Sequence, residues 1–258
     1  MNQKRLLQSR SSSKKRNSDP SAADDGTPLP IRILLTGFKP FAKRESNPSE
    51  TAVRRFSVRE IQSRYGLVLD KRILRVSRDA PRDLVEATGS YDIVLHLGVG
   101  RQIPAIQLEH LAYNKVNADL RDPSGKKGRN NPIVDGGPWI LKSTLPIARI
   151  IDDLCQQGVK CTLSEYAGNH ICNLLLYSSL LQARKSRSRA FVGFMHIPEN
   201  ALLPMKEVHK AMKTLILTCI PFVNASRRKR QTTSSLKELV RRFRRNGRLD
   251  LSANLTSR

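Results

Sequence analysis

Short apolar runs alternate with helix-like segments from residue 31 to residue 220, and this alternation is the feature that most constrains the fold. The runs are nearly continuous in apolar residues, as strands are when both faces of a sheet are covered. Predicted strands lie at 31–35, 67–76, 91–97, 106–114, 159–163 and 190–198, and predicted helices at 48–64, 81–89, 146–158, 172–183 and 203–218. We therefore predict an α/β fold, a single α/β/α sandwich domain with a mostly parallel central sheet.

The two ends of the chain differ from this region. Residues 1–29 are rich in Lys, Arg and Ser and have almost no apolar residues, which predicts a disordered, basic and polar N-terminal extension. We expect the α/β domain to span residues 30–220. Residues 221–258 would then form a basic, partly helical C-terminal extension.

The C-terminal extension contains one segment with helical periodicity. Leu236, Leu239, Val240 and Phe243 recur at the spacing of one helical face, and most of the other positions nearby are Arg or Lys. A short basic amphipathic helix of this kind could contact nucleic acid or an anionic membrane. The alternative is a solvated helix that docks on its own domain or on a neighbouring subunit.

Charge and cysteine content limit the kinds of protein that this chain can be. The net charge of +24 comes from both ends and from the middle of the chain, and it implies attraction to anionic surfaces. Four cysteines occur without metal-site spacing, which favours a reduced, intracellular protein, and we expect it in the cytoplasm. No apolar run reaches the roughly 20 residues that span a bilayer.

The glycines that follow the 91–97 strand do not indicate a nucleotide cofactor. Gly98 and Gly100 are two of the glycines that a dinucleotide fingerprint needs, but the third glycine and the following helix are missing. We therefore expect no dinucleotide cofactor here.

Cys172 is the candidate nucleophile. It follows a small polar turn at Gly168 and Asn169 and precedes the apolar run 174–181, which places it in the first turn of a helix. The partial positive charge of a helix N-terminus favours a thiolate over a thiol. The alternative is that Cys172 is an ordinary buried, small apolar residue.

The loop that follows the first strand is the candidate binding loop. Phe38 and Phe41 lie in it, and ligands bind at the carboxyl ends of strands in open α/β sheets. The alternative is that both rings are core anchors. Asn47 is expected to cap the next helix, with Pro48 at its first position.

Two further groups lie near strand ends. His196 is at the carboxyl end of one predicted strand, and Glu109 and His110 lie within another, where a solvated strand face is the alternative. If one edge of a parallel sheet gathers these groups with Cys172, they supply a nucleophile, a base or ion-pair partner and an orienting group.

Four segments, in order along residues 31–220, resemble the pyroglutamyl peptidase I family of cysteine exopeptidases. They are Thr36-Gly37-Phe38-x-Pro40-Phe41 with Asn47-Pro48-Ser49, Leu108-Glu109-His110-Leu111-Ala112-Tyr113-Asn114, Ala167-Gly168-x-x-x-Cys172-Asn173, and Phe194-x-His196-Ile197-Pro198. Their order and spacing agree with the family pattern. Members of this family remove an N-terminal pyroglutamyl residue from peptides.

This resemblance implies specific roles for residues in the four segments. Cys172 would be the nucleophile, His196 its proton partner and Glu109 the group that orients His196. Phe38, Phe41 and Asn47 match positions at the pyroglutamyl pocket. The family fold is a single α/β/α sandwich, often assembled into homotetramers, without metal or cofactor.

The chain departs from the family pattern at Val99, where many bacterial members have a glutamine that contacts the lactam ring. Residues 1–29 and 221–258 have no counterpart in the core pattern. The predicted activity is hydrolysis of the bond after an N-terminal pyroglutamyl residue. The alternative is a basic protein that binds nucleic acid or an anionic surface on a peptidase-like scaffold, with its active site idle or retuned.

Overall fold

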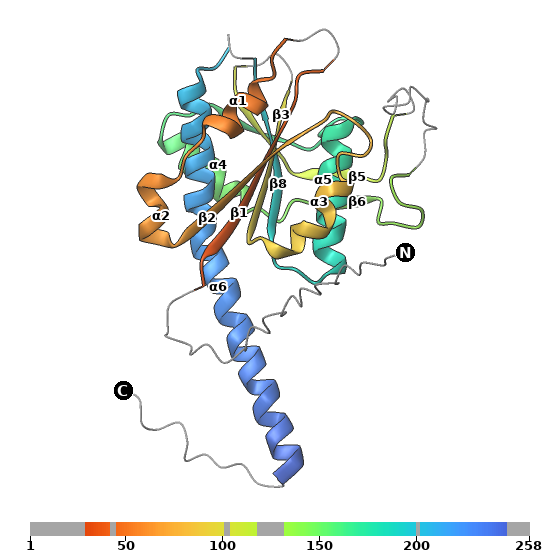
Figure 1. The fold of residues 1–258 in the computed structure, drawn as a ribbon, viewed down its shortest axis with the longest axis vertical. Helices are drawn as coiled ribbons and strands as arrows, with labels where there is room; N and C mark the ends of the chain where they lie inside the picture. The colour runs from red at the N-terminus through yellow and green to blue at the C-terminus, as the bar shows by residue number, and fades with distance from the viewer. Residues whose placement is uncertain (1–28, 42–44, 101–103, 118–131, 200–201, 247–258) are drawn as a thin grey trace, which may run out of the picture.

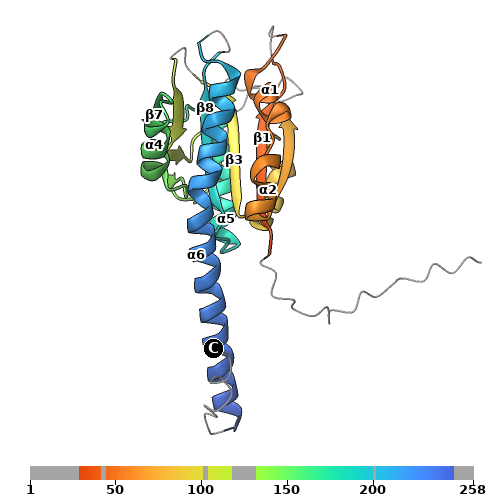
Figure 2. The same cartoon turned by 90° about the vertical axis from the view of Figure 1, so that its left-hand side faces the viewer.

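The computed structural model describes residues 29–41, 45–100, 104–117, 132–199 and 202–246. Residues 1–28, for which disorder was predicted, lie outside the described residues. Residues 247–258, the end of the C-terminal extension, also lie outside them. Within them, the predicted α/β sandwich is confirmed: a six-stranded sheet has helices on both faces (Figures 1 and 2).

The main sheet has the strand order β2-β1-β3-β8-β4-β7. Its strands are β1 (Ile31–Phe38), β2 (Leu67–Leu74), β3 (Ile93–Val99), β4 (Ile106–Glu109), β7 (Cys161–Ser164) and β8 (Phe191–Ile197). Every pairing is parallel except that of β4 with β8, so the sheet is mixed but mostly parallel. Strands β5 (Leu111–Tyr113) and β6 (Ile140–Lys142) form a separate antiparallel pair.

Helices cover the two faces of the main sheet in separate layers. One face carries α1 (Pro48–Arg55), α2 (Arg59–Tyr65), α4 (Ile147–Gln156) and α6 (Met205–Asn246), and the other carries α3 (Arg82–Val85), a 3-10 turn at Glu86–Ser90 and α5 (Ile171–Lys185) (Figure 1). Successive strand residues point to opposite faces. Ile33 and Leu35 therefore pack in the first layer, whereas Leu34 packs in the second.

His96 on β3 forms a polar link inside the second layer. Its Nδ1 lies 2.8 Å from Oγ1 of Thr36, and its Nε2 lies 3.0 Å from Oγ of Ser179 on α5. Burial lowers the pKa of His96 to about 3, so the ring is neutral at physiological pH. His96 thus holds strands β1 and β3 to α5.

The structure corrects two predicted elements on the amino-terminal side. The helix predicted for 48–64 is two helices, since Phe56 turns into the core after α1 and its backbone is extended. The strand predicted for 106–114 ends at Glu109, and the chain then leaves the main sheet to form β5.

The last helix is also longer than predicted. It was expected to end near Thr218, but α6 continues through Pro221 to Asn246. Buried Ile220 and Val223 flank the proline and hold both sides of it against the domain. Beyond residue 227 the helix extends away from the domain (Figure 2).

Among the described residues, no helix is long and apolar enough to cross a membrane. All four cysteines are free. Cys155 and Cys161 are neighbours, with their Sγ atoms 3.9 Å apart.

Gly37 allows β1 to approach α1 closely, and this contact yields a stability prediction. A Cβ at Gly37 would lie 2.4 Å from the carbonyl oxygen of Ser49, which is rigid backbone. We expect Gly37→Ala to lower the free energy of unfolding by about 1–3 kcal/mol, measured by thermal or urea unfolding. Gly89→Ala is the control, because its new methyl group would make only an ordinary contact with Ser186. Equal stability of both variants would contradict the packing argument.

Candidate active site

Cys172 is the second residue of α5, as the sequence predicted. Its side chain is half-buried and lines a cavity. The residues on either side, Ile171 and Asn173, are buried. The thiol therefore sits at a helix N-terminus and remains accessible from the cavity, a setting that suits a reactive cysteine.

Glycine at position 98 makes room for the thiol. A Cβ on Gly98 would lie 3.2 Å from Sγ of Cys172 and 2.8 Å from the Phe194 ring. A Cβ on Gly100 would lie 2.8 Å from Cβ of His196. The glycines that resemble a cofactor fingerprint thus serve close packing of β3 against the thiol and the imidazole.

Glu109 and His196 form a buried pair. Nδ1 of His196 lies 2.6 Å from Oε1 of Glu109, and the two residues are 8% and 2% exposed. The expectation that all three groups meet at one carboxyl edge of parallel strands is wrong for Glu109. Strand β4 runs antiparallel to β8, and Glu109 reaches His196 from the neighbouring strand, where it is paired with Phe194.

The electrostatics of the site favour a protonated His196. Burial lowers the pKa of His196, but the negative charges and hydrogen bonds of Cys172 and Glu109 raise it more, and the resulting pKa is about 10. The ring is therefore an imidazolium at neutral pH. It lies between the sulfur of Cys172 on one side and the carboxylate of Glu109 on the other.

Glu109 and the adjacent His110 differ in position. The second carboxylate oxygen of Glu109, Oε2, is buried without a hydrogen-bond partner, and Glu109 lines the cavity. His110 does not line the cavity, and its Nδ1 is likewise buried and unpaired. Of the two candidates on this segment, only Glu109 contacts His196.

The cavity beside these groups has a volume of about 1080 Å³. Phe38, Phe41 and Asn47 line it together with Glu109, Cys172 and His196, so the structure brings all six predicted site residues to one cavity. The remaining lining residues are Val76, Gly98, Val99, Gly100, Gln107, Ser164, Glu165, Tyr166, Ala167, Gly168, His170 and Ile171. Within the described residues, no cluster of His, Cys, Asp and Glu could hold a metal ion.

Comparison with known proteins identifies the family. The sequence model described as pyroglutamyl peptidase matches residues 31–222, about three quarters of the chain. The chain belongs to the pyroglutamyl peptidase family. Members of this family are cysteine-type omega peptidases, and the chain is an enzyme of this class.

Named relatives agree with this assignment. The pyrrolidone-carboxylate peptidase of Pyrococcus furiosus is 32% identical over 171 residues, 65% of this chain and 81% of that protein. The pyrrolidone-carboxylate peptidase of Thermococcus onnurineus is 31% identical and covers 74% of this chain and 99% of its own length. A solved structure of a pyrrolidone carboxyl peptidase variant from P. furiosus superposes with a TM-score of 0.68 at 27% identity, over 75% of this chain and all of that one.

Phe38 and Phe41 differ in how they contribute to the pocket of this pyroglutamyl peptidase. Phe38 is 3% exposed and packs in the second core layer, so the core-anchor alternative holds for it in part. Phe41 is 42% exposed and belongs to neither core cluster, although it lines the cavity.

Asn47 caps α1, as predicted, and also fixes the binding loop. Its Oδ1 accepts hydrogen bonds from the backbone N–H and the hydroxyl of Ser49, at 3.0 and 2.8 Å. Its Nδ2 donates to the carbonyl oxygen of Lys39 at 3.1 Å. The Ser49 hydroxyl in turn accepts from the N–H of Phe38. The amide of Asn47 therefore ties the loop that carries both rings to a helix.

Sequence reasoning assigned no role to Asn173, which follows the cysteine. The side chain is fully buried, and it accepts from the N–H of Tyr113 and donates to the carbonyl oxygens of Tyr113 and Lys115, all within 2.9 Å. These bonds fix the start of α5 against β5. The only signal in the sequence was the position of this amide between Cys172 and the apolar residues that begin at Leu174.

Replacement of Glu109 tests the buried pair. Glu109 raises the pKa of His196, so Glu109→Gln should lower that pKa by about one to two units, because a hydrogen bond to a charged group contributes about 1.5–3 kcal/mol. His196 then loses its proton at lower pH. We expect reduced but measurable turnover of a pyroglutamyl-coumarin substrate, with the alkaline limb of the kcat/KM profile moved to lower pH.

Glu165→Gln serves as the control for this pH profile. Glu165 lines the same cavity but is exposed and has no ion-pair partner among the described residues. Its replacement should leave the alkaline limb in place. An unchanged profile with full activity in Glu109→Gln would remove Glu109 from the pair that controls His196.

Proposed function

We propose that this peptidase hydrolyses the peptide bond after an N-terminal pyroglutamyl residue, with Cys172 as the nucleophile, His196 as its proton partner and Glu109 as the group that orients the imidazole. The observation that carries this proposal is the buried Glu109–His196 pair beside the half-buried thiol, at one cavity with aromatic walls. The names of its relatives, which are pyrrolidone-carboxylate peptidases, support the same substrate class.

The cavity suits the chemistry of a pyroglutamyl ring. The ring is flat and uncharged, and Phe38 and Phe41 offer apolar surface against which it can pack. An open N-terminal amine would be cationic, and it would lose solvation in such a pocket without gaining a counter-charge. We assign Phe38, Phe41 and Asn47 to substrate binding, with Asn47 acting by holding the loop.

Catalysis proceeds through a covalent intermediate. The Cys172 thiolate attacks the carbonyl carbon that follows the ring and forms a carbon–sulfur bond. His196 donates its proton to the leaving nitrogen as the carbon–nitrogen bond breaks, and the shortened peptide departs. A water molecule then attacks the thioester and gives a proton to His196. Pyroglutamate and the thiolate are released together.

The orientation of His196 explains why Glu109 is needed. Nδ1 is occupied by the carboxylate at 2.6 Å, so Nε2 is the nitrogen that can exchange a proton with substrate or water. The carboxylate also stabilises the positive charge of the ring in the resting site. A preformed imidazolium next to a thiolate is the resting state that this mechanism requires.

Several finer expectations stay predictions. Assembly into a homotetramer and a cytoplasmic location rest on the family resemblance and on composition. Val99 lines the cavity with an apolar side chain, so the lactam contact made by glutamine in many bacterial members has to come from another group. No observation favours the alternative of an idle active site, since the three proposed catalytic side chains lie together.

Removal of either reactive group tests the mechanism. We expect Cys172→Ala and His196→Ala each to reduce kcat on a pyroglutamyl-coumarin substrate by at least about a thousandfold. Cys155→Ala is the matched control, because that thiol is exposed and lies outside the cavity. Mass spectrometry of rapidly quenched wild-type enzyme should detect the pyroglutamyl adduct on Cys172. Retained activity in Cys172→Ala would end this assignment.

Phe41→Ala tests the aromatic wall. Loss of this exposed ring should raise KM about three- to tenfold with a smaller change in kcat, because the ring packs against the substrate equally in the ground and transition states. Trp139→Ala is a control for loss of an exposed aromatic residue elsewhere, since Trp139 is 61% exposed and does not line the cavity. An unchanged KM in Phe41→Ala would place the ring outside the substrate site.

A further inference from the structure

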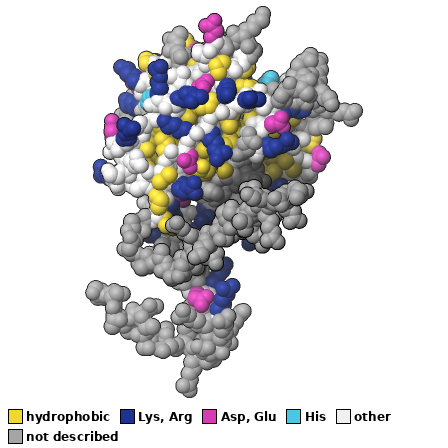
Figure 3. Space-filling model, in the orientation of Figure 1, with side chains coloured by type: hydrophobic (Ala, Val, Ile, Leu, Met, Phe, Trp, Pro, Cys, Tyr) yellow, Lys and Arg dark blue, Asp and Glu magenta, His cyan; other side chains and the backbone are white. Residues whose placement is uncertain are grey.

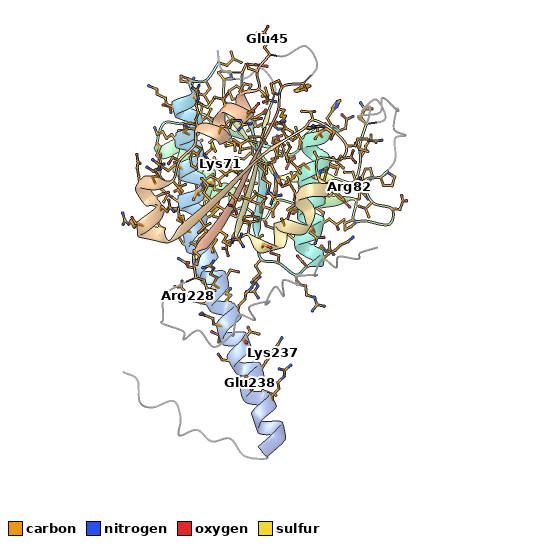
Figure 4. All side chains as sticks on the ribbon, in the orientation of Figure 1. Glu45, Lys71, Arg82, Arg228, Lys237 and Glu238 are labelled. Atoms are coloured by element: carbon orange, nitrogen blue, oxygen red, sulfur yellow. The ribbon has the colours of Figure 1, made fainter. Side chains whose placement is uncertain are left out.

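The carboxyl-terminal half of α6 has a different environment from its amino-terminal half. Residues 205–223 supply Val208, Met212, Leu215, Cys219 and Val223 to the core. From residue 228 onward every side chain that the structure describes is exposed. Figures 2 and 4 show this part of the helix extending beyond the domain, with Arg228, Lys237 and Glu238 on it.

Arg227 fixes the point at which the helix leaves the domain. Its guanidinium contacts Asp92 through two nitrogens, with Nη2 2.7 Å from Oδ2 and Nε 3.2 Å from Oδ1. It also donates to the carbonyl oxygens of Leu29 and Pro30. A two-pronged ion pair with extra backbone bonds holds the helix in one direction. The projecting part, residues 228–246, is therefore an exposed helix that is held to the domain at its start by Arg227.

The positive charge of this projecting part favours an anionic partner. Residues 228–246 contain eight Lys or Arg residues and one acidic residue, Glu238. The described cations Arg228, Lys229, Arg230, Lys237 and Arg241 form no ion pair with another described residue. In Figure 3 a few Lys and Arg side chains, with an acidic one beside them, are visible on this part of the molecule below the domain.

The same part of the helix exposes aliphatic side chains. Leu236 is 60% exposed and Val240 is 43% exposed, and they are one helical turn apart. Both positions lie beyond Val223, the last residue that α6 contributes to the core, so the domain leaves them exposed.

An apolar stripe with cations around it matches the interface of an anionic bilayer. Nucleic acid would bind the cations but would leave the aliphatic stripe exposed to water, because its affinity comes mainly from phosphate contacts. A second copy of the chain would bury the stripe but would bring two strongly basic helices together. We infer that residues 228–246 bind the surface of anionic lipid bilayers, with Leu236 and Val240 in the acyl-chain boundary and the basic side chains at the head groups.

Binding of the full-length chain to vesicles tests this inference. Vesicles of phosphatidylcholine with about one third phosphatidylserine should bind the protein, and vesicles of phosphatidylcholine alone should bind it at least about tenfold more weakly. Raising the salt concentration should weaken binding to the anionic vesicles. Flotation with a titration of lipid gives the apparent affinity.

Two variants separate the apolar and electrostatic contributions. L236Q/V240Q keeps all charges, and we expect it to weaken binding about tenfold or more, because insertion of both side chains is lost. R228Q/K229Q/R230Q keeps the apolar stripe, and we expect a loss on the order of a hundredfold. S234Q/S235Q is the control on the opposite side of the helix and should bind as the wild type does. All variants should keep their peptidase activity in solution, which verifies folding.

Three results would overturn the inference. The first is equal binding of wild type to neutral and anionic vesicles, or no binding to either. The second is unchanged vesicle affinity in L236Q/V240Q, which would leave only a diffuse charge effect. The third is a preference for duplex RNA or for self-association in sedimentation experiments, with no lipid binding.

Discussion

A protonated imidazole held between a carboxylate and a sulfur is the interaction on which the site depends. Burial alone would favour neutral His196, and Glu109 would be costly to bury without a partner. Together the charges compensate one another, while loss of one partner of such a pair typically costs about 3–5 kcal/mol. The sheet supplies the geometry, because β4 and β8 place the two side chains 2.6 Å apart on adjacent antiparallel strands.

Close backbone approach brings the thiol to this pair. Gly98 and Gly100 let the end of β3 pass beside Cys172 and His196, and Gly37 lets β1 contact α1. The buried side-chain amides of two asparagines then hold these segments in place. Asn47 holds the loop with Phe38 and Phe41, and Asn173 holds the first turn of α5. The cavity is thus shaped by backbone contacts and by side-chain amides that bond to backbone.

The two halves of helix α6 lie in different environments. Its first half is core, and the family match ends at residue 222, close to where its contacts with the domain end. Its second half is basic and exposed, and Arg227 sets the direction in which it leaves. The peptidase site and the proposed lipid-binding segment are therefore separate parts of one chain.

The sequence alone determined the α/β class, the cap at Asn47 and the place of Cys172 at a helix start, and the family resemblance named six residues that line one cavity in the structure. These features depend on local periodicity and short motifs. Only the tertiary structure decided that β4 runs against β8, that α6 passes Pro221, and that Asn173 bonds to Tyr113 and Lys115. Strand direction, helix length beyond a proline and the partners of a buried amide depend on contacts between residues far apart in sequence, and local patterns do not encode those contacts.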